Sequence, residues 1–284
     1  MIARLQTYAG FVRFSHSVFA LPFALVGALL ATRFTPWSWT RLLWIVGCMV
    51  TARSAAMGFN RLVDASFDAR NPRTAGRELP RGAMSVAEAR AFVAVSSILF
   101  VACTIPLGTV CFVLSPLALA IVFWYSLAKR HTAYTQAFLG LAMAVAPVGG
   151  WIAAGGPLRA EPWVLGLAIG TWVAGFDILY ACQDLEFDRR EGLLSIPVRY
   201  GISSSVRISR VLHAVTLLAL AIVGGLAALG GIYTVGVILV GGLLVYEQSL
   251  VSADDLSQVK RAFDLNGWVG LLYLATTALD LYVR

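Results

Sequence analysis

Charged residues are scarce in this chain. Only 13% of its 284 residues are Asp, Glu, Lys or Arg, about half the usual share of a soluble globular domain. In their place, apolar runs recur along the whole sequence, and each approaches the ~20 residues that a helix needs to cross a bilayer. This composition excludes an ordinary soluble protein and predicts an integral membrane protein whose surroundings are the lipid bilayer.

Cysteine motifs and a basic stripe are also lacking. The four cysteines lie in or beside apolar runs and form no Cys-x-x-Cys pair, so the sequence indicates neither a disulfide framework nor a zinc site. The net charge of +7 comes from basic residues that fall in particular gaps between the apolar runs. Because they form no uniform basic stripe, we expect no nucleic-acid partner.

The apolar runs predict an all-α membrane protein with nine transmembrane helices in one domain, residues 1–284. The runs are continuous and lack strand-like alternation, which favours helices over a barrel. The first run has no convincing small-residue cleavage site, so we expect it to stay in the membrane. The predicted spans are 14–33, 40–59, 86–106, 110–128, 134–155, 162–182, 208–228, 232–250 and 265–282.

The distribution of Lys and Arg predicts the orientation. An odd number of spans places the two termini on opposite sides of the membrane. With the N-terminus inside, nearly all basic residues lie inside or near inner helix ends, and the exceptions are Arg33, Arg41, Arg159 and Arg284. This bias agrees with the positive-inside rule and predicts that the N-terminus faces the cytoplasm.

Three polar residues continue the second apolar run in steps of four: Asn60, Asp64 and Asp68. On a helix each step drifts by only roughly 40°, so the three side chains project toward one face. The segment that follows is rich in arginine, and its prolines and glycines break regular helix. We therefore expect residues 70–81 to form a mobile lid whose arginines contact phosphate, namely Arg70, Arg73, Arg77 and Arg81.

A second acidic cluster ends the sixth span. Asp177, Asp184 and Asp188 are spaced by seven and four residues, which again selects one helical face. Asp177 is expected within the membrane, where an unpaired carboxylate is costly and usually functional. Both clusters lie at the inner ends of their spans, so we expect them to face one shared site.

Two facing groups of carboxylates are typical of a divalent-cation site. Mg²⁺ prefers oxygen ligands and commonly bridges one or two carboxylates to substrate phosphates, while Arg and Lys hold the remaining phosphate charge. The alternative is a solvated inner rim whose arginines serve topology alone. Topology requires no aligned acids, so we favour a magnesium–diphosphate site with basic contacts from Arg70, Arg73, Lys129 and Arg130.

These motifs together resemble a known family. Asn-x-x-x-Asp-x-x-x-Asp at 60–68, and the spacing of 177, 184 and 188, are similar to the two aspartate-rich motifs of UbiA-type intramembrane prenyltransferases. The segment YSLAKRHTAYTQAFLG, residues 125–140, resembles the family's tyrosine–lysine–arginine segment. The stretches ARNPRTAGRELPRG and LEFDRREGLLSIPVRYG look like those of bacterial 4-hydroxybenzoate polyprenyltransferases. One departure is Arg61, where many members have Asp.

The resemblance covers most of the chain and implies a UbiA-type helical bundle in a bacterial inner membrane, with its active site facing the cytoplasm. It implies Mg²⁺-dependent transfer of a polyprenyl group from a prenyl diphosphate to a small aromatic acceptor, in ubiquinone or menaquinone biosynthesis. The expected metal ligands are Asn60, Asp64, Asp68, Asp184 and Asp188. The expected catalytic residues are Asp64, Asp68, Asp177, Asp184, Asp188 and Tyr125. The expected substrate contacts are Arg13, Arg53, Asn60, Arg70, Arg73, Lys129 and Arg130.

The roles of two side chains have alternatives. The ring of Tyr125 would stabilise an allylic cation, but an interfacial aromatic position explains it equally well. Arg53 lies seven residues before Asn60, close to the same helical face. UbiA-type enzymes have an arginine at this spacing, which implies a contact with the carboxylate of 4-hydroxybenzoate. The alternative for Arg53 is a structural pair with Asp177, because a charge inside a span needs a partner or water.

Two other classes of protein share part of this pattern. An ion-coupled transporter also uses intramembrane acids, often near the bilayer midplane. Here the acids lie at the inner boundary beside arginine-rich loops, which favours a diphosphate site. A related transferase with a glycerol phosphate, haem or chlorophyll-type acceptor is the other alternative. The local motifs favour a small aromatic acid.

Overall fold

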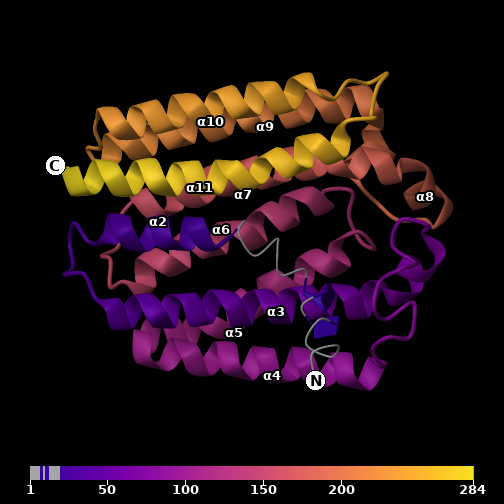
Figure 1. Ribbon diagram of the computed structural model, residues 1–284, viewed down its shortest axis with the longest axis horizontal. Helices are drawn as coiled ribbons and strands as arrows, with labels where there is room; N and C mark the ends of the chain where they lie inside the picture. The colour runs from indigo at the N-terminus through magenta and orange to yellow at the C-terminus, as the bar shows by residue number, and fades with distance from the viewer. Residues whose placement is uncertain (1–6, 9, 13–19, 284) are drawn as a thin grey trace.

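The computed structural model describes residues 7, 8, 10–12 and 20–283, and every regular element in this part of the chain is helical. The long helices lie side by side along one direction, and the short helix α8 lies at one end of the bundle (Figure 1). The helices are α2 (Leu21–Ala31), α3 (Trp39–Arg70), α4 (Val86–Thr104), α5 (Thr109–Ala128), α6 (Thr135–Ala153), α7 (Glu161–Ala181), α8 (Leu185–Arg190), α9 (Ile196–Leu226), α10 (Gly231–Ser249) and α11 (Val259–Val283).

The helical prediction is confirmed, and the number of membrane spans stays a prediction. Within the described residues, seven helices are long and apolar enough to cross a membrane. Each of the nine predicted spans overlaps a helix. In the first predicted span, 14–33, helix α2 has only 11 residues, and residues 14–19 lie outside the described part of the chain. Helix α11 has 25 residues but is not among the seven; its first turns carry Lys260, Arg261 and Asp264, and its last carries Asp280.

Helix α3 carries the first acidic cluster beyond the apolar run. Ser38 caps its start by accepting a hydrogen bond from the Arg41 N–H. The helix then continues without interruption to Arg70 and ends at Asn71, whose backbone is extended, as expected for a residue before proline. The spacing of the cluster is therefore helical, as predicted, and the side chains of Asp64 and Asp68 are buried.

Glycines hold α6 against the helices on both sides of it. A Cβ built on Gly150 of α6 would overlap the carbonyl oxygen of Ala24 in α2, and one on Gly27 would overlap that of Pro147. On its other side, a Cβ on Gly140 would overlap the carbonyl oxygen of Gly170 in α7. Such small residues let helix backbones approach closely in a membrane protein.

Gly150→Ala should therefore destabilise the fold by about 1–3 kcal/mol, because the added methyl group must push α2 away from α6. Gly149→Ala is the matched control, since a Cβ at Gly149 meets no atom within 4 Å. Thermal unfolding of the purified protein in one detergent measures both variants. Equal unfolding temperatures for the two variants would contradict this account of the contact.

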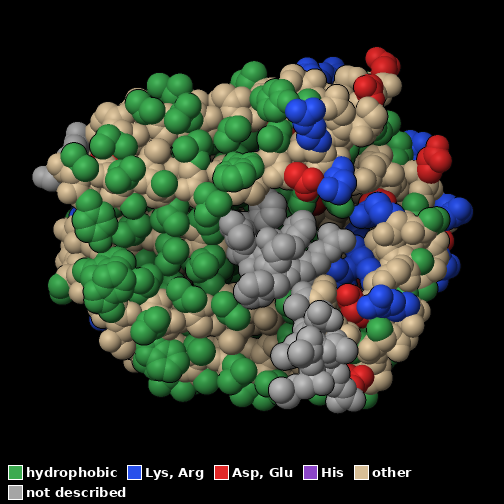
Figure 2. Space-filling model, in the orientation of Figure 1, with side chains coloured by type: hydrophobic (Ala, Val, Ile, Leu, Met, Phe, Trp, Pro, Cys, Tyr) green, Lys and Arg blue, Asp and Glu red, His purple; other side chains and the backbone are tan. Residues whose placement is uncertain are grey.

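The surface divides into a large apolar part and a charged end. On the face in Figure 2, the charged side chains gather mainly at the end where α8 lies in Figure 1, and hydrophobic side chains cover much of the remainder. Large apolar side chains are exposed along the helices, among them Leu43, Ile98, Val113 and Ile238. Exposure of this extent is typical of a lipid-facing surface, and the chain is a multi-pass membrane protein.

Candidate active site

A cavity of about 250 Å³ opens at the charged end of the bundle. Its walls come from α3, α5, α6, α7, α8 and the loops that follow α3 and α8. Both acidic clusters lie on its lining, so the prediction that they share one site agrees with the geometry. The predicted site residues that line it are Asn60, Asp64, Asp68, Arg73, Tyr125, Lys129, Asp177, Asp184 and Asp188.

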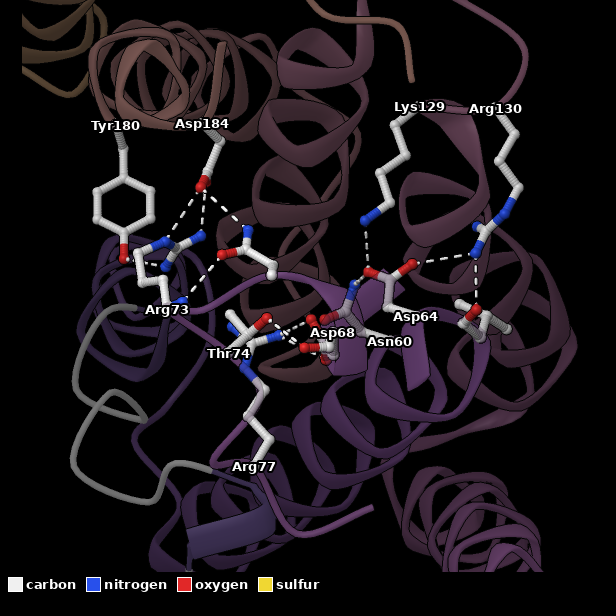
Figure 3. A network of polar contacts seen from close by, with 12 residues as sticks. Asn60, Asp64, Asp68, Arg73, Thr74, Arg77, Lys129, Arg130, Tyr180 and Asp184 are labelled. Carbon is white, nitrogen blue, oxygen red and sulfur yellow. Dashed lines mark hydrogen bonds and ion pairs between the residues drawn. The ribbon is translucent and has the colours of Figure 1, made fainter. Parts of the chain in front are cut away.

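Asp64 lies where α3 and the end of α5 meet (Figure 3). One carboxylate oxygen accepts a hydrogen bond from Lys129 Nζ at 2.7 Å, and the other accepts one from Arg130 Nη2 at 3.1 Å. Asn60 Nδ2 donates to the same carboxylate at 3.2 Å. Asp64 is only 3% exposed, so these pairs compensate much of the cost of burying its charge.

Asp68 is paired within the same stretch of chain. Arg77 Nη1 lies 2.7 Å from both carboxylate oxygens, and the backbone oxygen of Asp68 accepts a hydrogen bond from the Thr74 hydroxyl at 3.1 Å. These contacts fold the loop after α3 back over the end of its own helix. They also occupy both oxygens of an expected metal ligand with one guanidinium.

Arg73 links the loop after α3 to the second acidic cluster. Its guanidinium donates to both oxygens of Asp184 and, at 3.0 Å, to the Tyr180 hydroxyl. Asn71 Nδ2 donates to the same Asp184 carboxylate at 3.3 Å. Burial lowers the pKa of Arg73, but its hydrogen bonds to Asp184 and the charge of that group outweigh burial, so the pKa is raised above its ordinary value. Arg73 therefore stays charged at any pH at which an enzyme works.

Of the predicted substrate contacts that the structure describes, three do not line the cavity. Arg70 pairs with Glu191 at 2.7 Å, and half of its side chain is exposed. Arg53 lies within electrostatic range of Tyr125, which does line the cavity. Arg130 reaches the site through its contact with Asp64. Arg13 lies outside the described residues.

The sequence predicts that the loop after α3 is a lid. Its residues Asn71, Arg73, Thr74 and Arg77 form part of the cavity lining, and Asn71 and Thr74 are buried. The loop lies beside the aspartates of the cavity, where a lid would lie. The mobility of this loop stays a prediction. In the structure, Arg77 of the loop pairs with Asp68 of the first cluster, and Arg73 pairs with Asp184 of the second.

The sequence interpretation missed some lining residues. Asn71 and Thr74 follow the acidic motif directly, and an asparagine just before Pro72 is a signal that the end of the helix lies there. Gln136 is 2% exposed, and its Oε1 accepts a hydrogen bond from the Ile196 N–H at 3.3 Å. Gln136 lies within residues 125–140, the segment with the tyrosine–lysine–arginine pattern, but no charge or spacing within that segment singles it out.

The donor set suits a magnesium ion that a phosphate group helps to hold. Within the described residues, no three His, Cys, Asp or Glu side chains converge as a ready-made metal site. The cavity instead presents carboxylate and amide oxygens on separate walls, and Mg²⁺ accepts such oxygens together with water and phosphate. The residues therefore fit a metal that enters with a diphosphate, and they do not fit a metal held by protein ligands alone.

Comparisons with known proteins agree with this geometry. Residues 20–272 match the model of the UbiA prenyltransferase family. A 4-hydroxybenzoate octaprenyltransferase of Aeromonas hydrophila subsp. hydrophila is 32% identical over 242 residues, which is 85% of this chain and 84% of the relative.

Two solved structures share the fold. The apo structure of a UbiA homolog from Aeropyrum pernix has a TM-score of 0.86 and 34% identity, and the match covers 94% of this chain and 98% of that one. A UbiA homolog from Archaeoglobus fulgidus bound to DMAPP and Mg²⁺ has a TM-score of 0.73 and 19% identity, with coverage of 98% and 100%.

Proposed function

Because the chain belongs to the UbiA prenyltransferase family, and is therefore an enzyme of prenyl transfer, we propose that it moves a polyprenyl group from an allylic prenyl diphosphate to a small aromatic acid. The observation that carries this proposal is the cavity in which both aspartate clusters and their basic partners meet. A diphosphate leaving group needs this combination of oxygen ligands for a metal and cations for phosphate.

The basic side chains would hold the diphosphate while the carbon–oxygen bond breaks. Lys129 and Arg130 approach from α5, and Arg73 and Arg77 approach from the loop after α3. Fixed positive charge aimed at the departing phosphate stabilises the charge that develops there. Magnesium, held by Asn60, Asp64, Asp68, Asp184 and Asp188, would neutralise the same leaving group.

The allylic cation must then meet the acceptor and not water. Tyr125 and Tyr180 line the cavity, and an aromatic ring face attracts a nearby cation. Asp177 lines the same wall as Tyr180, where we assign it to the reacting region. Arg53 would hold the acceptor carboxylate and so orient the ring toward the cation.

The acceptor we propose is 4-hydroxybenzoate or a close analogue, and the pathway is ubiquinone or menaquinone biosynthesis. Support comes from the motifs of the chain and from a relative named 4-hydroxybenzoate octaprenyltransferase at 32% identity over most of both chains. We place the protein in a bacterial inner membrane with its N-terminus and active site toward the cytoplasm, because the basic residues follow the positive-inside rule in that orientation.

Incubation of membranes that contain the protein with several prenyl diphosphates and acceptors tests this function. We expect a prenylated aromatic acid by mass spectrometry, formed only with Mg²⁺ and suppressed by a chelator. Prenylation of a glycerol phosphate, with none of the aromatic acid, would overturn the acceptor assignment. Cleavage of no prenyl diphosphate at all would overturn the proposed reaction.

A further inference from the structure

Three motif carboxylates form ion pairs with basic side chains in the structure. Asp64 contacts Lys129 and Arg130, Asp68 contacts Arg77, and Asp184 contacts Arg73 (Figure 3). These acids are the expected metal ligands, and the same cations are the expected phosphate contacts. Each group therefore already has a partner, and an entering metal or diphosphate would compete for it.

Competition between a basic side chain and a metal ion should be strongest at the pair of Arg77 and Asp68. A single guanidinium nitrogen lies 2.7 Å from both carboxylate oxygens, and the side chains of Arg77 and Asp68 are only 19% and 9% exposed. A metal ion bound to Asp68 would either displace this nitrogen or be repelled by its positive charge at short range. At such distances, and with little water, repulsion between like charges is substantial.

Charge balance points to the same exchange on the phosphate side. A diphosphate that enters alone meets the carboxylates of both clusters, and their repulsion falls only when a metal covers them. If Lys and Arg side chains moved from the carboxylates to the phosphate, and a metal ion were held by the carboxylates instead, each charged group would still have a partner of opposite charge. An arginine or a lysine serves a carboxylate and a phosphate with the same donors, so the exchange needs only a side-chain movement.

We propose that Arg77, Arg73 and Lys129 are exchangeable counter-ions that compete with the metal for the motif carboxylates until a diphosphate draws them away. The proposal rests on the proposed function for the identity of the ligands. In this scheme, the basic side chains weaken metal binding before the diphosphate arrives and strengthen binding of the diphosphate. The resting site thus avoids filling with metal before the substrate arrives.

The test uses the full chain in detergent, with Mn²⁺ as the probe and electron paramagnetic resonance as the readout. Without diphosphate, Arg77→Gln should bind Mn²⁺ at least about 5-fold more tightly than the wild type, which is the lower end of usual coupling between sites. The same variant should bind inorganic diphosphate more weakly in the presence of metal. Arg90→Gln is the control, because it removes one exposed charge from α4, away from the cavity lining, and it should shift Mn²⁺ affinity far less.

Other roles for Arg77 predict other changes in the affinities for Mn²⁺ and diphosphate. A purely structural arginine would weaken both metal and diphosphate binding on removal, and a pure phosphate contact would leave the affinity for Mn²⁺ alone unchanged. Either result overturns the proposal. Lys129→Gln repeats the test from α5, so it decides the question if Arg77→Gln does not fold. Prenyl transfer by the wild type is assayed separately, so loss of the counter-ion effect with intact transfer rejects this inference and leaves the proposed function standing.

Discussion

Asp64→Asn should lower the rate of prenyl transfer by at least about 10²–10³-fold, the effect usual for loss of one strong electrostatic contribution to the transition state. Asparagine keeps the shape of the side chain but removes the charge that Lys129 and Arg130 contact. The variant would lose a proposed metal ligand, and it leaves two cations without the charge that they contact. Asp184→Asn should have a comparable effect, because its carboxylate lies on the opposite wall of the same cavity.

Product formation at limiting Mg²⁺, measured by mass spectrometry, checks this expectation. Asp254→Asn is the control: Asp254 is exposed in the loop before α11 and should be replaceable without loss of activity. Membrane insertion and thermal unfolding are compared for all three variants, so that misfolding is not taken for lost catalysis. Near-normal transfer by either motif variant would show that the two clusters do not act on one metal–diphosphate site.

The helical faces of the site could be predicted because their spacing is a property of one helix. Asn60, Asp64 and Asp68 follow the apolar run in steps of four, and the structure confirms that α3 continues through all three. Their partners could not be predicted in the same way. Lys129 is 65 residues from Asp64, and which of several nearby cations meets which acid depends on how α5 packs on α3.

Hydropathy located the apolar parts of the helices and missed their polar extensions. Helix α3 runs to Arg70, although its predicted span ends at 59. Helix α9 starts at Ile196, 12 residues before its predicted span, and it bends at Gly201 with a φ of 79°. Polar residues form helix as readily as apolar ones when caps and packing support it. A hydropathy window therefore underestimates the length of helices that continue into polar sequence.

Arg53→Leu should reduce kcat/KM for a carboxylated phenol by about 10²-fold or more, the usual cost of truncating one partner of a buried charge pair. The affinity for prenyl diphosphate should change little. Arg53 lies on α3 within electrostatic range of Tyr125, on the side of the site away from the loop that carries Arg73 and Arg77. We therefore propose that Arg53 acts on the acceptor and leaves the diphosphate contacts intact.

The comparison requires two variants and two acceptors. Arg53→Lys should recover only part of the activity, because an ammonium group lacks the planar fork that meets both carboxylate oxygens. A phenol without the carboxylate should be a poor substrate for the wild type and should lose little further in Arg53→Leu. If the variant instead loses prenyl diphosphate affinity and acceptor turnover equally, Arg53 serves the fold, and a pair with Asp177 becomes the better explanation. The two readouts thus separate recognition of the acceptor from support of the helix that carries the acids.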